Sequence, residues 1–189
     1  MKLKIISIAF LLTFLCISCN ETENQTKKTA NKIISVIENK NFNELAEFID
    51  KDLGLYVSQK ITASFNYFNH ISFDDIINAT ESNKEMSFYI DDDPSERWNT
   101  TVFKFLSATF PVSENRKRHV SYNAYISSID WALGAQSIAE IFPDSIFIEY
   151  YYEPSGLYGD LDWQSIYLIF KKEKNNIFLI GLACNYGGI

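Results

Sequence analysis

The residues best suited to chemistry lie in one short segment near the end of the chain, Tyr158, Asp160, Asp162 and Trp163, after a run of tyrosines at 150–152. Aromatic faces beside carboxylates can hold sugars, amines or peptides through apolar stacking and charged hydrogen bonds. The same residues also have a structural explanation, because strand aromatics fill a core and turn aspartates accept backbone N–H groups. We therefore treat the four as candidate ligand-binding residues and leave both explanations open.

Catalytic machinery is hard to assemble from the other polar residues. His70 and His119 are the only histidines, and neither stands in a metal-ligand spacing or beside a nucleophile elbow. A glycosidase needs an acid and a nucleophile about 5 to 9 Å apart, usually on separate segments, whereas Asp160 and Asp162 are two residues apart. We therefore expect no enzyme and no catalytic residue, with a hydrolase that uses these loop carboxylates as an alternative.

Other reactive groups also favour structural roles. Cys184 ends an apolar run, where a thiol behaves as a small hydrophobe with a raised pKa. Three aspartates at 91–93 lack the glycine and the distant glutamate of a calcium-binding loop. No stretch matches a phosphate-cradling loop. We expect neither a metal nor a cofactor.

The N-terminus has the pattern of an export signal. Two lysines, Lys2 and Lys4, precede an apolar run over residues 5–17, which would span roughly 20 Å as a helix, short of the ~30 Å core of a bilayer. Ser18 and Cys19 follow, and a polar stretch begins abruptly after them. The segment could be an ordinary secretory peptide or an uncleaved anchor, and both are alternatives to a lipoprotein signal.

This segment resembles the bacterial lipobox, with Cys16 where the motif usually carries Leu. The resemblance implies a signal peptide at 1–18, and a Cys19 that is diacylated and, after cleavage, often acylated again on its amino group. Two or three chains make a stable anchor. Asn20 after the cysteine favours the outer membrane of a two-membrane bacterium, so we expect a lipid-anchored protein of the cell envelope, facing the periplasm or the surface.

The remaining chain is acidic and has the length of one domain. We expect a lipidated flexible tether over 19–28 and a single domain over 29–189, long enough to bury roughly 70% of its unfolded surface. Without residues 1–18 the chain has 15 basic and 24 acidic residues, a net charge of −9. Such a chain is a poor partner for nucleic acid. The only basic cluster, at 116–119, is expected to be a solvated loop.

Periodicity predicts helices early and strands late. Apolar spacing and caps predict helices over 30–37, 41–50, 73–80 and 101–110, with a later one over 135–142. Strands are expected over 55–58, 120–126, 145–152, 164–172 and 177–184. This order indicates an α+β fold, with the N-terminal helices packed on one face of a curved antiparallel sheet. A cystatin-like or NTF2-like cone is our specific expectation.

Three stretches, at 39–58, 138–170 and 178–189, resemble a family of uncharacterised exported bacterial proteins. The most specific motif of this family is a Y-G-x-x-D-W segment, which this chain has at 158–163. The family usually ends in V-G-I-V-H-D, whereas this chain has Cys184 and Asn185 in place of the His-Asp pair. The resemblance implies no activity. We therefore expect a non-enzymatic domain that binds a ligand, a peptide, a glycan or an envelope protein, or alternatively an inhibitor or immunity-type protein that blocks a partner.

Overall fold

The structure, a computed structural model, describes residues 21–60, 68–90, 93–111, 116–126, 134–174 and 176–187, with the side chains at 93–94 and 134–137 excepted. The signal segment at 1–18 and Cys19 lie outside the described residues. Cleavage and lipidation therefore stay predictions.

The first described element is a helix over residues 21–38. Its apolar stripe is buried as the spacing predicts, with Ile33, Ile34 and Ile37 at most 1% exposed. The helix also includes residues 21–28, for which the polar composition predicts a flexible tether, and here the structure differs. One local contribution is an ion pair: Lys27 Nζ lies 2.6 Å from Glu23 Oε1 one turn away, and such pairs stabilise a helix.

Tertiary contacts extend into the same segment. Thr26 is fully buried and its hydroxyl donates to the Thr22 carbonyl oxygen at 2.7 Å. Lys172, from the far end of the chain, donates to the Thr22 hydroxyl at 2.9 Å. The ordered domain therefore reaches back at least to residue 21.

Short elements connect this helix to the sheet. A 3-10 helix, η1 (Phe42–Phe48), replaces the α-helix expected there, and β1 (Leu55–Ser58) follows. Gly54 precedes β1 with φ +64°, and a Cβ at this position would lie 2.6 Å from the Ile71 carbonyl oxygen of β2 (Asn69–Ile71). Only glycine fits both the backbone angle and the space, so this turn fixes the entry into the sheet.

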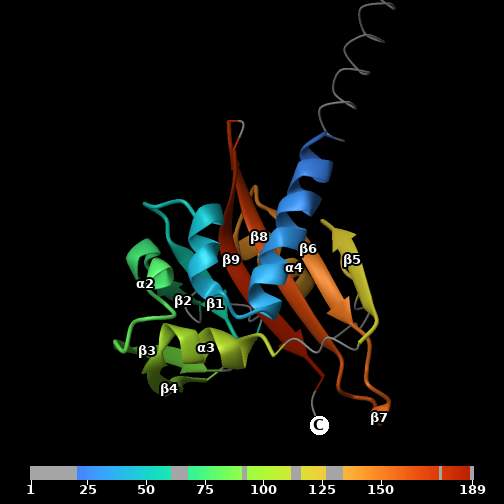
Figure 1. Ribbon diagram of the computed structural model, residues 1–189. Helices are drawn as coiled ribbons and strands as arrows, with labels where there is room; N and C mark the ends of the chain where they lie inside the picture. The colour runs from blue at the N-terminus through green and yellow to red at the C-terminus, as the bar shows by residue number, and fades with distance from the viewer. Residues whose placement is uncertain are drawn as a thin grey trace, which may run out of the picture.

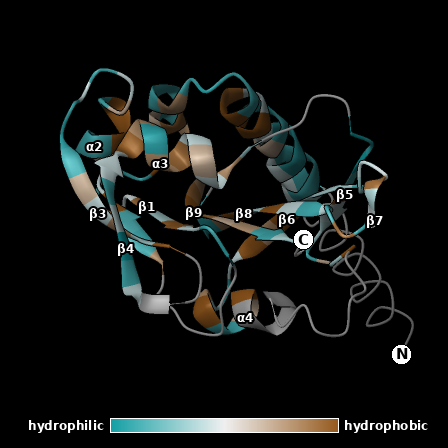
Figure 2. Ribbon diagram, turned by 90° about the horizontal axis from the view of Figure 1, so that it is seen from below, coloured by the Kyte–Doolittle hydropathy of each residue, from teal (hydrophilic) through white to brown (hydrophobic). Residues whose placement is uncertain are grey.

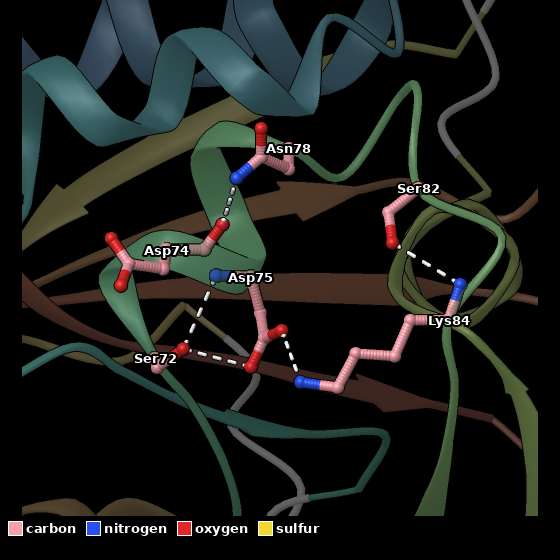
Figure 3. Close-up of polar contacts among 6 residues, drawn as sticks. All are labelled: Ser72, Asp74, Asp75, Asn78, Ser82 and Lys84. Carbon is pink, nitrogen blue, oxygen red and sulfur yellow. Dashed lines mark hydrogen bonds and ion pairs between the residues drawn. The ribbon is translucent and has the colours of Figure 1, made fainter.

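The helix α2 (Phe73–Ile77) begins at the predicted cap. The Ser72 hydroxyl accepts from the Asp75 backbone N–H at 3.1 Å and donates to the Asp75 carboxylate at 2.8 Å, while Lys84 Nζ lies 2.7 Å from the other carboxylate oxygen (Figure 3). Partial burial raises the pKa of Asp75, but the hydrogen bonds from Lys84 and Ser72 outweigh it and keep that pKa below its ordinary value. These contacts cap the helix, and in them Ser72 and Lys84 both bond to Asp75.

A two-stranded hairpin that the periodicity does not predict comes next, β3 (Glu85–Ile90) paired with β4 (Asp93–Thr101). Thr101 then caps α3 (Val102–Thr109), close to the predicted bounds. The hairpin packs on this helix through the stacked rings of Phe88 and Phe105, whose centroids lie 4.0 Å apart.

The main sheet has the order β2-β1-β9-β8-β6-β5. Its later elements are β5 (Arg118–Tyr122), α4 (Gly134–Ile141), β6 (Ile146–Tyr152), β7 (Leu157–Asp160), β8 (Gln164–Glu173) and β9 (Asn176–Tyr186). The α+β class is confirmed and the sheet is curved and unclosed. It is mixed rather than antiparallel, because β1 pairs in parallel with β9.

Helices cover both faces of this sheet (Figure 2). The N-terminal helix, η1 and α3 lie over the larger apolar core, which includes Leu168 and Leu182. A smaller core, with Phe142, Phe147 and Tyr167, forms on the opposite face beneath α4. This second layer explains why β8 is apolar without alternation: seven consecutive residues from Gln164 are buried, because both faces are covered.

Candidate functional site

Asp162 acts mainly as a structural tie. Its carboxylate accepts hydrogen bonds from the Ser155 backbone N–H at 2.9 Å, the Ser155 hydroxyl at 2.5 Å and Arg116 Nη2 at 3.1 Å. Arg116 Nη1 also donates to the Asp162 carbonyl oxygen. The Ser155 hydroxyl, its backbone N–H and the Arg116 guanidinium hold the pKa of Asp162 below its ordinary value. The turn that begins at Ser155 is thus closed and fastened to the segment before β5.

Trp163 is buried, with 4% of its surface exposed. Its ring stacks on Tyr151 with centroids 6.1 Å apart, and Gly187 lies against its edge so closely that a Cβ there would meet the indole nitrogen at 2.7 Å. The tyrosine run around Tyr151 is likewise structural, because Tyr150 and Tyr152 are buried in the larger core.

Tyr158 and Asp160 lie apart from the other two candidates. They belong to β7, whose four residues are all exposed, and Tyr158 has 56% of its surface exposed. The charge of Asp160 contributes to raising the pKa of Tyr151, after burial and the carboxylates of Glu153 and Glu149. The structure therefore brings Asp162 and Trp163 together but places Tyr158 and Asp160 on the outside of the loop.

Asp162 and Trp163 form one wall of an open cleft with a volume of about 420 Å³. Such a volume lies within the usual range for small-molecule sites. The cleft is built where the end of α3, the start of β8 and the end of β9 meet. Figure 1 shows the start of β8 and the end of β9 near the C-terminus. The lining residues, here called the Arg116 cleft, are Gln59, Ala108, Thr109, Pro111, Arg116, Asp162, Trp163, Gln164, Tyr186 and Gly187.

Gln164 is the most informative residue of the Arg116 cleft. Its side chain is buried, with 7% exposure, and its amide nitrogen lies 3.3 Å from the weakly accepting Cys184 sulfur. Among the described residues, no group donates to its amide oxygen, and Gln59 and the Trp163 indole N–H also have no hydrogen-bond partner there. The Gln164 oxygen and the indole nitrogen are not among the fully enclosed polar atoms of the described residues, so water or a ligand can reach them. The cleft therefore presents amide and indole groups that are available to hydrogen-bond a ligand.

Sequence reasoning missed this arrangement. The sequence alone does not point to Gln59, Gln164 or Tyr186, and it presents Arg116 only as part of a basic cluster. The one available signal was a glutamine at the start of an otherwise apolar strand. No local sequence pattern indicates that Gln59 and Tyr186 lie beside Gln164 in the fold.

The basic cluster at 116–119 is paired with acids. Besides Arg116 with Asp162, Lys117 lies 2.8 Å from Glu153, Arg118 lies 3.0 Å from Glu38, and His119 lies 2.5 Å from the same Glu153 carboxylate. Lys117, Arg118 and His119 thus bond to carboxylates of the same fold while staying 69%, 37% and 39% exposed. The other histidine, His70, lies 2.8 Å from the Leu53 carbonyl oxygen at the turn before β1.

The prediction that Cys184 is a core residue is confirmed. It is fully buried, and burial raises the pKa of its thiol to about 12. Within the described ranges no three His, Cys, Asp or Glu side chains are grouped so as to hold a metal ion. The acidic run at 91–93 lies largely outside these ranges, with only Asp93 described, in β4.

No described helix is long and apolar enough to cross a membrane. Comparison of the chain with protein family models, with curated proteins and with solved structures finds no match.

Proposed function

We propose that this chain is an exported, lipid-anchored protein of the cell envelope whose domain binds a ligand without transforming it. The observation that carries the binding role is the Arg116 cleft, with a buried glutamine whose amide oxygen has no described partner. The anchor is Cys19, on the strength of the lipobox resemblance.

The position of the cleft fits presentation away from a membrane. Lys172 contacts Thr22 near one end of β8, whereas Gln164 starts β8 at the other end. At about 3.3 Å per strand residue, these two ends of β8 are about 26 Å apart. Figure 1 likewise has the start of the N-terminal helix at one end of the sheet and the C-terminus at the other. Cys19 is only two residues before this helix, so an acyl anchor there would leave the cleft facing outward.

The chemistry of the cleft supports binding better than catalysis. Asp162 is the one carboxylate among the described lining residues, and its oxygens are already bonded to Ser155 and Arg116. Glycoside hydrolysis needs two carboxylates across a substrate. The nearby Cys184 thiol is buried, and its pKa of about 12 keeps it protonated.

A second candidate function is an inhibitor or immunity-type protein. The observation that favours it is the apolar tip of the β7 loop, where Leu157, Tyr158 and Leu161 are 82%, 56% and 56% exposed. Exposed large apolar groups gathered at one place are typical of protein contacts, and tyrosine is often an energetic anchor there. Replacing Leu157 and Tyr158 by serine should abolish partner inhibition and leave ligand binding in the Arg116 cleft unchanged.

The anchor is tested by replacing Cys19 with alanine. Radiolabelled palmitate should be incorporated into the wild-type protein and not into this variant, which should leave the membrane fraction or accumulate as precursor. The matched control is Cys16→Leu, three residues earlier, which should keep both label and membrane association because it introduces the residue that the motif usually carries. Equal labelling of the Cys19 variant would disprove lipidation at this site.

The binding role is tested on the whole protein by nuclear magnetic resonance with ¹⁵N-labelled tryptophan. A screen of small fluorinated fragments should move the indole N–H signal of Trp163, which lines the cleft, more than that of Trp98, which lies in β4. A screen in which no compound moves the Trp163 signal would contradict the proposal.

A further inference from the structure

We infer that the ligand of the Arg116 cleft is a neutral sugar unit, either a free saccharide or one residue of a glycan. This inference rests on the proposed binding role of the cleft. It follows from three properties of the lining: its charge, its hydrogen-bonding groups and its apolar surface.

The charge of the lining is balanced. Among the lining residues that the structure describes, Arg116 and Asp162 carry the charges, 3.1 Å apart and with side chains 23% and 10% exposed. An anionic ligand would have to compete with Asp162 for the guanidinium, and a cationic one would meet Arg116. A neutral ligand disturbs neither partner, so the charge favours an uncharged molecule.

The free hydrogen-bonding groups are of both kinds. The amides of Gln59 and Gln164 each offer a donor and an acceptor, and the Trp163 indole offers a donor. A sugar hydroxyl also donates and accepts, and a planar amide can bond two neighbouring hydroxyls at once. A purely apolar ligand would leave the Gln164 oxygen buried without a partner, at a cost that favours hydroxyl-bearing ligands.

Apolar surface stands beside these polar groups. Ala108 and Pro111 line the same cleft, and the ring of Tyr186 stands at its rim with 44% of the residue exposed. A sugar ring has one face of C–H groups that packs on an aromatic ring while its hydroxyls bond sideways. The combination of planar amides and an exposed tyrosine fits this amphipathic shape.

An extended peptide fits less well. Peptides recognised by a sheet add to a free strand edge. At the cleft both edges of β8 are occupied, because Gln164 is paired with Tyr152 on one side and with Tyr186 on the other. The backbone N–H of Gly187 likewise donates to the Trp163 carbonyl oxygen at 3.0 Å.

The experiment uses the full chain with ¹⁵N-labelled tryptophan, whose three indole signals are assigned by replacing Trp98 and Trp131 in turn. The probes are methyl glucoside, methyl galactoside and N-acetylglucosamine, with glucuronate and glucosamine as charged counterparts. We expect at least one neutral sugar to shift the Trp163 signal saturably, and its charged counterparts to bind more weakly. A trisaccharide that binds more tightly than its monomer identifies a glycan as the source, whereas equal affinity identifies a free sugar.

Variants locate the binding. Gln164→Leu removes the amide at similar volume and should weaken sugar binding about tenfold, the equivalent of one lost hydrogen bond. Gln59→Ala, at a half-buried position, provides a second variant should Gln164→Leu fail to fold. Gln25→Ala, on the exposed side of the N-terminal helix, is the matched control and should bind as the wild type does.

The two proposals fail separately. Fragments that move the Trp163 signal while no neutral sugar does would overturn the sugar assignment and leave the binding role intact. Preference for glucuronate or for glucosamine over the neutral sugars would also overturn it. If neither fragments nor sugars move the signal, both proposals are wrong.

Discussion

Arg116 and Asp162, 46 residues apart in the chain, are joined by a side-chain pair at 3.1 Å and by a second bond from Arg116 Nη1 to the Asp162 carbonyl oxygen. A planar guanidinium that bonds two acceptors at once fixes orientation as well as distance. This one contact forms a wall of the cleft and holds the turn that leads into β8. Arg116→Lys should therefore not preserve this two-bond contact, because an ammonium lacks the planar fork of the guanidinium.

The first prediction separates the two aspartates of this segment. Asp162→Asn should lower the denaturation midpoint in urea, because it weakens the bonds to Arg116 and Ser155, whereas Asp160→Asn on exposed β7 should change stability by no more than about 0.5 kcal/mol. Equal midpoints for both variants would contradict the structural role.

The pH dependence of the same pair has a definite sign. The pKa of Asp162 is lower in the folded protein than its ordinary value, so its ionised form stabilises the fold at pH values above that ordinary value. This contribution is lost as the pH falls through the folded-state pKa. The stability difference between wild type and Asp162→Asn should accordingly shrink in acid, which urea titrations at a series of pH values would measure.

The second prediction concerns Trp163. Because its ring is buried against Tyr151, Trp163→Ala should cost about 3–5 kcal/mol of unfolding free energy. Tyr158→Ala, five residues earlier and 56% exposed, is the matched control and should be nearly neutral. Similar losses in both variants would mean that Tyr158 is not exposed in solution.

Local patterns predict elements well and their partners poorly. The cap at Ser72, the helix near 101–110 and the core position of Cys184 follow from short-range rules, and the structure confirms them. The parallel pairing of Tyr56 with Gly181 joins residues far apart in the chain, and no periodicity encodes such a pairing. The Arg116 cleft has the same origin, because Gln59, Arg116 and Tyr186 become neighbours only through the sheet order.

Composition misled us in one place, the segment after Cys19. Polar residues without apolar periodicity suggest a tether, but Glu23 and Lys27 stand at helical spacing and Thr26 is buried. The spacing of charges along a helix was the usable signal.

The third prediction follows from this difference. A chain that starts at residue 29 should melt lower than one that starts at residue 21, since it loses buried Thr26 and the contact of Lys172 with Thr22. For a domain of this size each lost kcal/mol lowers the melting temperature by about 2–4 °C. Identical melting temperatures in calorimetry would restore the tether interpretation.

The fourth prediction uses the Cys184 thiol. In a variant whose other two cysteines are replaced by serine, iodoacetamide at mildly alkaline pH should label Cys184 slowly in buffer and rapidly in urea, because burial shields it and raises its pKa to about 12. The melting temperature should be the same with and without reductant. Rapid labelling of the folded protein would place this thiol at the surface.

The last prediction concerns Glu149, a carboxylate that is fully buried on the α4 face of the sheet. It accepts hydrogen bonds from the Ile126 backbone N–H at 2.6 Å, the Ser165 hydroxyl at 2.6 Å and the Tyr167 hydroxyl at 3.2 Å. The segment after β5 is thus fastened to β6 and β8 through one side chain. Its negative charge also contributes, after burial, to raising the pKa of Tyr125 to about 12.

Glu149→Leu should be strongly destabilising, because each buried donor left without an acceptor costs about 1–3 kcal/mol. Glu149→Gln keeps one acceptor oxygen and should lose less. In the leucine variant, the Ile126 amide should also exchange its hydrogen faster than the amides of β8, which remain paired with β6 and β9. Hydrogen exchange followed by mass spectrometry measures this difference. Unchanged protection at Ile126 in a folded Glu149→Leu protein would show that another contact holds this segment.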